Sequence, residues 1–519
     1  MKNNNKQGIS PELEFISSLI NQAKFKEALE KLESFEKQNP NDTNFQFNKL
    51  GFLVDIGFGL KNKNIVQQGL DIGENNLINP KYTKHKTSVH YNLANGYLSL
   101  YELSEKKDIE SIPQSEDLQK AKSHFRKAIE ICNDNVPNLK KQMWVNYGNC
   151  LDNLGRTVEA FYAYDEALKI DNEFSMAIGN KAKASCFFAD ISREYRTAIY
   201  IEAHQAISPI INKPDLIEIG GIAAKIGFEK KLEKIESLFK DKSILKKNME
   251  HPKYDTENLS DFEKYYIDFC IKENLFLNFH IHQGHCEAAI KDPIFISLIT
   301  KGEDGQAFYN LAKYINQIKE DYAVARLLLV QSQHKREDFD RISMRTTFVN
   351  CLDYSKFNLY TGLLKSSFKE AYNILDKIAV FINVYYGLGL SEDRIYFTTI
   401  WEKEKKIRNE ILNSKNFSLY ALYDIYQDFK SCHYKEIQNI RRALTHRKLV
   451  VFDSMFTDGH KKDNPNNISY DTMLNKTIEV LQLSKAAIIY LINFVNMEEN
   501  KKRKVGLVAP MYVDTTQFL

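Results

Sequence analysis

The sequence has few of the residues that interrupt helices or cross-link small secreted folds. Only 11 prolines and 21 glycines occur in 519 residues, and this scarcity favours helix over sheet. The seven cysteines are odd in number and scattered, and no Cys-x-x-Cys pair occurs. These features exclude a disulfide framework and indicate reduced thiols.

Long apolar segments are also missing. The N-terminus, Met1-Lys2-Asn3-Asn4-Asn5-Lys6, lacks the apolar core of a signal peptide. The longest strongly apolar stretch, Ala486–Val495, is too short to cross a bilayer. Hydrophobic residues make up 43% and charged residues 27% of the chain, as in ordinary soluble proteins. We therefore expect a cytoplasmic protein with no membrane partner.

Charge is nearly balanced, because 71 Lys and Arg face 68 Asp and Glu for a net charge of +3. This balance neither requires nor excludes a nucleic-acid partner. The chain has no Walker A loop, Gly-x-Ser-x-Gly elbow, His-Glu-x-x-His helix or Rossmann glycine fingerprint. These absences remove most familiar enzyme classes, and we expect no cofactor. A chain of this length is sufficient for two to four domains.

The clearest local pattern is a helix pair between about Met143 and Asp171. Large and small residues alternate along two helical stripes, one before and one after a turn at residues 153–156. Small residues at Gly148, Ala160 and Ala167 would let two antiparallel helices approach closely. This order of large and small positions resembles the tetratricopeptide repeat, a helix pair of about 34 residues.

Weaker copies of the same pattern lie before this pair, and helical patterning without a clean motif continues after it through residues 182–207 and towards residue 238. One fits around Ala28, another begins at His90, and its second helix includes Ala121. The polar insert Glu105–Asp117 separates these last two helices, and we expect it to be an exposed loop. The sequence thus predicts a helical repeat domain over residues 1–240. A stack of such pairs forms a groove, so we expect a protein or peptide ligand there.

Residues 241–350 are expected to form a helical middle region. They contain Leu275-Phe276-Leu277-Asn278, followed by a cluster of possible zinc ligands: His280, His282, His285 and Cys286. The spacing does not fit a preformed tetrahedral site, and no distant Cys or His pair completes one. We favour an exposed His-rich loop over a metal site. Helical periodicity returns at residues 307–317 and 321–334.

Residues 351–519 are expected to form a helical bundle. Apolar residues at helical spacing predict a long helix over residues 357–386, and Gly387-Leu388-Gly389 ends it. A charged helix over 396–412 and an apolar one over 418–429 follow. The last two helices are predicted to begin near Tyr434 and Tyr470, with a polar break between them.

The helix that begins near Tyr434 contains Arg441 and His446. Arg is a permanent cation for a phosphate, and His exchanges protons near neutral pH. Such a pair can cleave RNA without a metal, although this spacing alone is common. Five residues along a regular helix turn through about 500°, so the two side chains would lie about 140° apart.

The whole arrangement resembles a bacterial family in which tetratricopeptide repeats are fused to a HEPN domain. The resemblance depends on the N-terminal repeats, the segment 275–278 and a C-terminal Arg-x4-His helix between a long and a closing helix. HEPN domains are all-α, and many are ribonucleases of toxins, CRISPR effectors and antiphage proteins. The resemblance implies an all-α chain: a repeat solenoid, a helical linker region and a C-terminal four-helix bundle.

By this resemblance, Arg441 and His446 are the catalytic residues of a metal-independent endoribonuclease that leaves a 2′,3′-cyclic phosphate. The resemblance also implies a homodimer through the HEPN-like domain and a role in antiphage defence or as a toxin. The repeat array would sense a trigger or hold the nuclease inactive. The family commonly has Asn, Asp or His after the motif arginine, whereas this chain has Arg442. The chain also has Lys448 where some HEPN toxins have a tyrosine that a partner enzyme adenylylates, so control of that kind is not expected.

The basic residues Arg442, Arg447 and Lys448 are expected to contact the RNA backbone, or else to form a solvated basic face. His433 and Tyr434 precede the motif helix and are weaker candidates for lining its cleft. The run Lys501-Lys502-Arg503-Lys504 is interpreted as a solvated tail. The alternative to a nuclease is a non-catalytic scaffold that binds RNA or protein.

Overall fold

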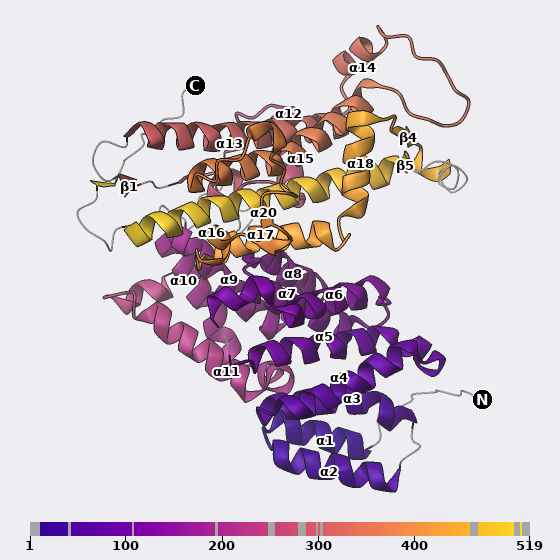
Figure 1. Cartoon of the computed structure of the whole chain (residues 1–519), viewed down its shortest axis with the longest axis vertical. Coiled ribbons are helices and arrows are strands. Elements are labelled where there is room, and N and C mark those ends of the chain that lie inside the picture. The colour runs from indigo at the N-terminus through magenta and orange to yellow at the C-terminus, as the bar shows by residue number, and fades with distance from the viewer. Residues whose placement is uncertain are drawn as a thin grey trace. The chain divides into compact units, whose positions relative to one another are not determined.

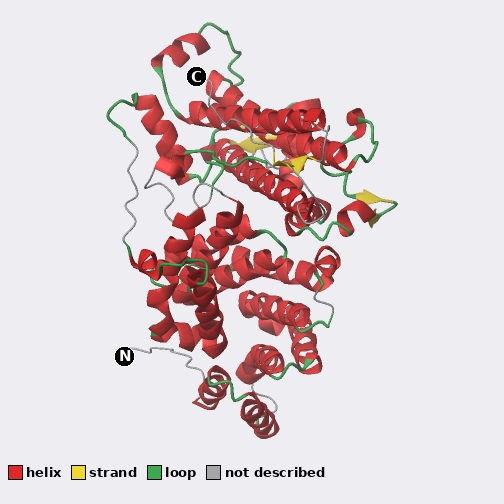
Figure 2. Ribbon diagram, turned by 90° about the vertical axis from the view of Figure 1, so that its left-hand side faces the viewer, coloured by secondary structure: helices red, strands yellow, loops and turns green. Residues whose placement is uncertain are grey.

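The computed structural model describes residues 11–39, 43–105, 108–191, 196–247, 255–278, 287–296, 299–300, 305–456, 466–502 and 509–510. Two compact units divide the chain at Met249 and Glu250. The described residues of both units are overwhelmingly helical, which confirms the predicted all-α class. Figure 2 shows that strands are few and short among the helices.

The N-terminal unit is a series of helices joined by short connections (Figure 1). Its α-helices are α1 (Pro11–Asn21), α2 (Phe25–Gln38), α3 (Thr43–Gly59), α4 (Lys63–Ile78), α5 (Lys86–Glu102), α6 (Glu116–Ile131), α7 (Pro137–Asn153), α8 (Thr157–Ile170), α9 (Ser175–Ile191), α10 (Arg196–Ile207) and α11 (Pro214–Glu236). From α1 to α10, consecutive helices pack as pairs, and each pair contacts the next. This is the tetratricopeptide-like arrangement that the sequence predicts.

Close packing between α7 and α8 depends on the glycine that the sequence analysis identified. A Cβ atom added at Gly148 would lie 2.4 Å from a ring carbon of Tyr164. The Tyr164 hydroxyl donates a hydrogen bond to the Asn149 side chain, 3.0 Å away. Ala160 and Ala167 on α8 are fully buried. Small residues therefore set the distance between the two helices, as expected.

The insert between α5 and α6 is only partly the exposed loop that we expected. Ile109–Gln114 forms a short 3-10 helix, and α6 already begins at Glu116. Ile112 and Pro113 are buried in it. The prediction gave too much weight to the polar residues around Ile112, whose apolar side chain is stabilised by burial.

Two histidines in this unit should make its stability depend on pH. The Nδ1 atoms of His90 on α5 and His124 on α6 lie 2.9 Å apart. Burial, and then the charge of His124, lower the pKa of His90 to about 4 from its ordinary 6.5. Because the unfolded chain binds this proton more readily, stability is complete above about pH 6.5 and falls as the pH drops towards 4.

We therefore predict that α5 and α6 open more easily at pH 5 than at pH 7. Hydrogen exchange of peptides from these helices, corrected for intrinsic rates, would measure the free energy of opening. A His90→Gln variant keeps a polar side chain without a titrating ring, and its opening free energy should change less with pH. An equal change in both proteins would contradict the assignment to His90.

The C-terminal unit contains the remaining elements (Figure 1). Its α-helices are α12 (Asp261–Lys272), α13 (Gly305–Gln333), α14 (Glu337–Ser343), α15 (Leu359–Tyr386), α16 (Asn409–Leu412), α17 (Phe417–Lys430), α18 (Lys435–His446) and α20 (Tyr470–Lys502). Its strands pair as β1 (Ile299–Thr300) with β6 (Ala509–Pro510), β2 (Glu402–Lys403) with β3 (Lys406–Ile407), and β4 (Val450–Phe452) with β5 (Asn467–Ser469).

The core of this unit lies along α20. A nearly continuous run of buried residues covers its middle, from Val480 to Val495, and it packs against α13, α15 and α17. The predicted order of a long helix, a shorter helix, the motif helix and a closing helix corresponds to α15, α17, α18 and α20. Residues 241–350, which the sequence analysis treated as a middle region, include α13, and α13 packs closely along α15.

The predicted helix over residues 396–412 is wrong. The segment contains the β2–β3 hairpin, and only Asn409–Leu412 at its end is helical. Glu404 and Lys405 form the turn with φ values of 53° and 64°, which a helix excludes. Trp401, just before the hairpin, is fully buried. Charged residues with good helix propensity misled the prediction, because burial of the apolar residues beside them decides the conformation.

Candidate functional site

Helix α18 is a short amphipathic helix that packs on α15. Ile437, Ile440 and Ala443 form its buried face, and their spacing of three residues is that of one side of a helix. The helix ends at His446, because Arg447 takes an extended conformation while its amide still donates to the Ala443 carbonyl. Packing on α15 therefore fixes the directions in which the remaining side chains of α18 point.

Arg441 lies at the edge of that buried face and contacts two residues of α15. Its Nη2 atom is 3.3 Å from Oδ2 of Asp376, and its guanidinium carbon lies 5.2 Å from the centre of the Tyr372 ring. About a quarter of its side chain, 26%, remains exposed. The guanidinium is thus held by a carboxylate and an aromatic ring, and part of it remains open to solvent.

The electrostatics around Arg441 are those of a partly desolvated ion pair. Burial raises the pKa of the Asp376 carboxyl, whereas the Phe397 amide and the Arg441 guanidinium lower it. The Phe397 amide donates to Oδ1 of Asp376 at 2.8 Å. Burial, followed by the nearby Asp376 charge, raises the pKa of Tyr372 to about 12. The loop that replaces the expected helix over 396–412 therefore positions the carboxylate that holds Arg441.

His446 is exposed at the last position of α18. Within the part of the chain that the structure describes, its ring has no hydrogen-bond or ion-pair partner. Thr445 beside it donates to the Arg441 carbonyl at 2.9 Å. The imidazole is accordingly open to solvent.

Three cations surround this end of the helix. Arg442 is exposed, and it donates to the Asn439 side chain at 3.1 Å and to the Gln438 carbonyl at 3.4 Å. Arg447 and Lys448 are exposed too, and no carboxylate among the described residues pairs with them. The side chains are therefore free to contact a polyanion.

One side-chain hydrogen bond and a short sheet hold the main chain just after the motif. Lys365 on α15 donates to the Leu449 carbonyl at 3.0 Å. Val450–Phe452 pairs in parallel with β5, and Phe452 also pairs with Ser355. The position of His446 is thus fixed from both sides, by the packing of α18 and by this short sheet.

Arg441 and His446 do not face the same direction within one chain. Helix α18 runs without interruption from Lys435 to His446, so the two side chains differ by about 140° around its axis. Arg441 contacts α15, whereas His446 is exposed. Helix α18 therefore has no kink between the two residues, and each side chain addresses a different surface.

Several sequence-based candidates fall elsewhere. His280, His282, His285 and Cys286 lie outside the described residues. No group of three or more His, Cys, Asp or Glu side chains among the described residues could hold a metal ion. His433 is exposed and Tyr434 is buried just before α18.

The basic run near the C-terminus is only partly described. Lys501 and Lys502 form ion pairs with Glu498 and Glu499, and Arg503 and Lys504 lie outside the described residues. The two described lysines are therefore paired within the protein, and we do not assign the run to the site.

One helix among the described residues is long and apolar enough to cross a membrane. This helix is α20, and 83% of its most apolar 18-residue window is buried inside the protein. Its apolar residues are those that pack on α13, α15 and α17, so the length and composition of α20 are explained by its position in the core.

Comparisons with known proteins find a family match within the C-terminal unit. Residues 303–498 match the LA2681-like HEPN family, and this range includes α15, α17, α18 and most of α20. No curated protein matches the chain.

Among solved structures, a thermophilic TPR protein from Thermus thermophilus matches 43% of this chain and 97% of its own, with 17% identity and a TM-score of 0.31. The helix pairs described above, rather than this alignment, define the repeat fold. The chain is a fusion of tetratricopeptide-like helical repeats with an LA2681-like HEPN domain.

Proposed function

We propose that this protein is an endoribonuclease that cuts RNA without a metal ion. The proposal depends on one observation. In a HEPN domain, a single helix holds an arginine fixed by Asp376 and Tyr372 and ends in an exposed histidine that no described residue pairs with. A positioned cation and a titratable ring are the two groups that phosphodiester cleavage by the RNA 2′-hydroxyl requires.

The chemistry uses the nucleophile that RNA itself contains. The 2′-oxygen attacks the adjacent phosphorus, the bond to the 5′-oxygen breaks, and the products are a 2′,3′-cyclic phosphate and a 5′-hydroxyl. His446 would accept the 2′-hydroxyl proton or donate one to the leaving oxygen. Arg441 would stabilise the extra negative charge on phosphorus, because only one of its five N–H donors is used by Asp376.

One chain is not sufficient for both proton transfers, since the attacking and leaving oxygens lie on opposite sides of phosphorus. We therefore propose that two protomers place their α18 helices in a single cleft. The unbroken α18 supports this arrangement, because its Arg441 and His446 face different directions within one chain. Arg442, Arg447 and Lys448 would then contact neighbouring phosphates, and each such contact makes binding more sensitive to salt.

The repeats would regulate this activity. Stacked helix pairs create a groove that suits a protein or peptide ligand, and such a ligand would release or restrain the nuclease. This organisation fits a toxin or an antiphage effector, whose cleavage must remain silent until a trigger arrives.

Cleavage of single-stranded RNA in the presence of EDTA tests the proposal. We expect products with 2′,3′-cyclic phosphate and 5′-hydroxyl ends, identified by mass spectrometry. DNA of the same sequence should stay intact, because it lacks the 2′-hydroxyl. RNA that is bound but never shortened, with or without Mg²⁺, would instead favour a non-catalytic RNA-binding scaffold, and a chain that binds no RNA at low salt would favour a protein-binding adaptor.

A further inference from the structure

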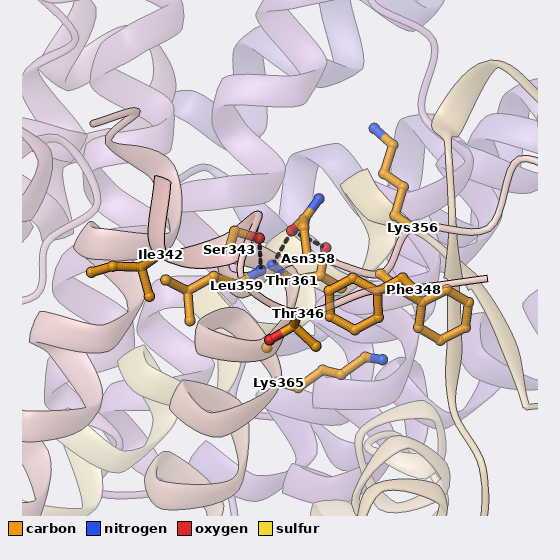
Figure 3. Close-up of a pocket in the computed structure, with 11 residues that line it drawn as sticks. Ile342, Ser343, Thr346, Phe348, Lys356, Asn358, Leu359, Thr361 and Lys365 are labelled. Atoms are coloured by element: carbon orange, nitrogen blue, oxygen red, sulfur yellow. Dashed lines mark hydrogen bonds between the residues drawn. The ribbon is translucent and has the colours of Figure 1, made fainter. Parts of the chain in front are cut away.

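A cavity of about 380 Å³ lies in the C-terminal unit, outside the motif helix (Figure 3). Helix α14, the loop that follows it and the first two turns of α15 form its walls. The lining residues are Ile342, Ser343, Thr346, Phe348, Lys356, Phe357, Asn358, Leu359, Thr361, Gly362 and Lys365. Its volume lies within the usual range for small-ligand pockets, about 300–1,000 Å³.

Most of the surface that these residues present to the cavity is apolar, and it includes two aromatic rings with large exposed fractions. Phe348 is 49% exposed and Phe357 is 40% exposed. Both come from the irregular loop between α14 and α15, so neither ring is part of the helical core. Exposed phenyl rings on a cavity wall offer faces on which a planar ligand can stack.

Lys365 gives the cavity an uncompensated positive charge. Its ammonium group donates to the Leu449 carbonyl and lies 5.9 Å from the centre of the Phe357 ring. An ammonium has three donors, so two remain for a ligand. Burial lowers the pKa of Lys365, and no carboxylate among the described residues opposes that effect.

The second lysine in the cavity is already neutralised. Lys356 forms an ion pair with Asp453 at 2.8 Å. In the view of Figure 3, Lys356 and Lys365 lie on two sides of the Phe348 ring. Two amides at the start of α15 are also satisfied, because Leu359 donates to the Ser343 hydroxyl and Thr361 donates to Asn358. Of the two lysines in this cavity, Lys365 is therefore the one whose charge no carboxylate among the described residues neutralises.

The cavity lies close to the proposed cleavage site along the chain. Leu449, whose carbonyl contacts Lys365, is three residues after His446, so their Cα atoms are at most roughly 11 Å apart. Lys448, an exposed cation, lies between them. A strand of RNA that reaches His446 would therefore pass near the cavity.

We propose that this cavity binds one nucleotide of the RNA strand, with its base stacked on Phe348 and Phe357 and its phosphate at Lys365. The inference rests on the proposed ribonuclease function for the source of the nucleotide. It assigns to the α14–α15 loop the role of holding the strand beside the cleavage site and of selecting the base there. Because this role concerns binding and not cleavage, the contribution of the cavity to RNA affinity can be measured with RNA that stays uncut.

The test uses the full chain with His446→Ala, so that RNA stays intact, and a fluorescently labelled single-stranded RNA followed by anisotropy. In this background Phe348→Ala and Phe357→Ala should each weaken binding about tenfold. Lys365→Met keeps the length of the side chain and should lower the slope of log K against log salt by about 0.7, the value for one phosphate on a single strand.

Val349→Ala is the matched control, because Val349 is adjacent to Phe348, is 83% exposed and does not line the cavity. Its affinity for RNA should be unchanged. Calorimetry with adenosine and uridine monophosphates, with the same variants, tests whether the cavity takes free nucleotides instead.

The outcomes separate this inference from the proposed function. If RNA is cut by the wild type but all three cavity variants bind it normally, the inference is overturned and the nuclease remains. If RNA is not cut but binding falls in the cavity variants alone, the nucleotide site is supported and the proposed chemistry fails. Monophosphate binding that the variants abolish, with RNA binding unchanged, would overturn RNA as the source.

Discussion

Replacing His446 with alanine is expected to slow RNA cleavage by about 10²–10⁴-fold, the contribution of a general acid–base group. His446 is the only histidine of α18, and its ring is exposed. Because the described structure gives that ring no partner, the substitution should change the free energy of unfolding by less than about 0.5 kcal/mol. Initial rates with labelled RNA and urea denaturation of the same variant would measure the two quantities.

His433→Ala serves as the matched control. His433 is an exposed histidine just before the first turn of α18, so its replacement removes an imidazole beside the same helix without touching the motif. Its cleavage rate should equal that of the wild type. Arg441→Ala is a poorer test, because it also leaves Asp376 partly buried without its cation. Equal rates for the wild type and His446→Ala would contradict the proposed mechanism.

The helices of the C-terminal unit could be predicted because each has a clear apolar stripe. The expected helices over 357–386 and 418–429 correspond to Leu359–Tyr386 and Phe417–Lys430, and the expected starts near Tyr434 and Tyr470 agree with α18 and α20. Periodic burial determines these elements locally. The predicted helix over 396–412 was wrong because this segment has no such stripe. Its charged residues favour helix, but Trp401 is buried by residues far away in the sequence, and that burial decides the conformation.

Some residues of the candidate site could likewise be predicted from the sequence, and others could not. Arg441 and His446 could be named from their spacing and from the resemblance to the HEPN superfamily. Asp376 could not, because it lies 65 residues from Arg441 along the chain and shows no distinctive pattern in its own helix. The cavity was missed as well, since Phe348 and Lys365 come together only when the α14–α15 loop folds back on α15. Long-range contacts of this kind leave no periodic signal in one sequence.

A large loss of stability is expected on substitution of Arg326, a buried residue on α13. Its guanidinium makes a bidentate contact with Asp292, at 2.8 and 3.1 Å, and also donates to the Leu275 carbonyl and the Tyr266 hydroxyl. Only 5% of Arg326 is exposed. The Leu277 amide donates to the same carboxylate at 2.6 Å. One ion pair thus joins α12, the segment 275–278 and α13.

Arg326→Met should destabilise the C-terminal unit by about 3–5 kcal/mol, because it leaves the Asp292 carboxylate without its cation. The two tryptophans make this measurable, since Trp144 lies in the N-terminal unit and Trp401 in the C-terminal unit. In a Trp144→Phe background, urea denaturation followed by fluorescence reports Trp401 alone. Arg341→Met, which removes an exposed pair with Glu337, is the control and should change stability by less than about 0.5 kcal/mol.

The position of Trp401 lets this experiment test whether residues before the family match fold together with the HEPN helices. The family match begins at residue 303, so it leaves out Tyr266, Leu275 and Asp292, whereas Trp401 lies inside it. If Arg326→Met lowers the urea midpoint reported by Trp401, then α12, residues 275–278 and residues 287–296 fold cooperatively with the HEPN helices. An unchanged midpoint would show that these residues only cover a bundle that is stable without them. Since Gln482 and Lys485 of α20 also donate to the carbonyls of Glu273 and Asn274, we expect the cooperative result, and a HEPN domain in this chain that extends well before residue 303.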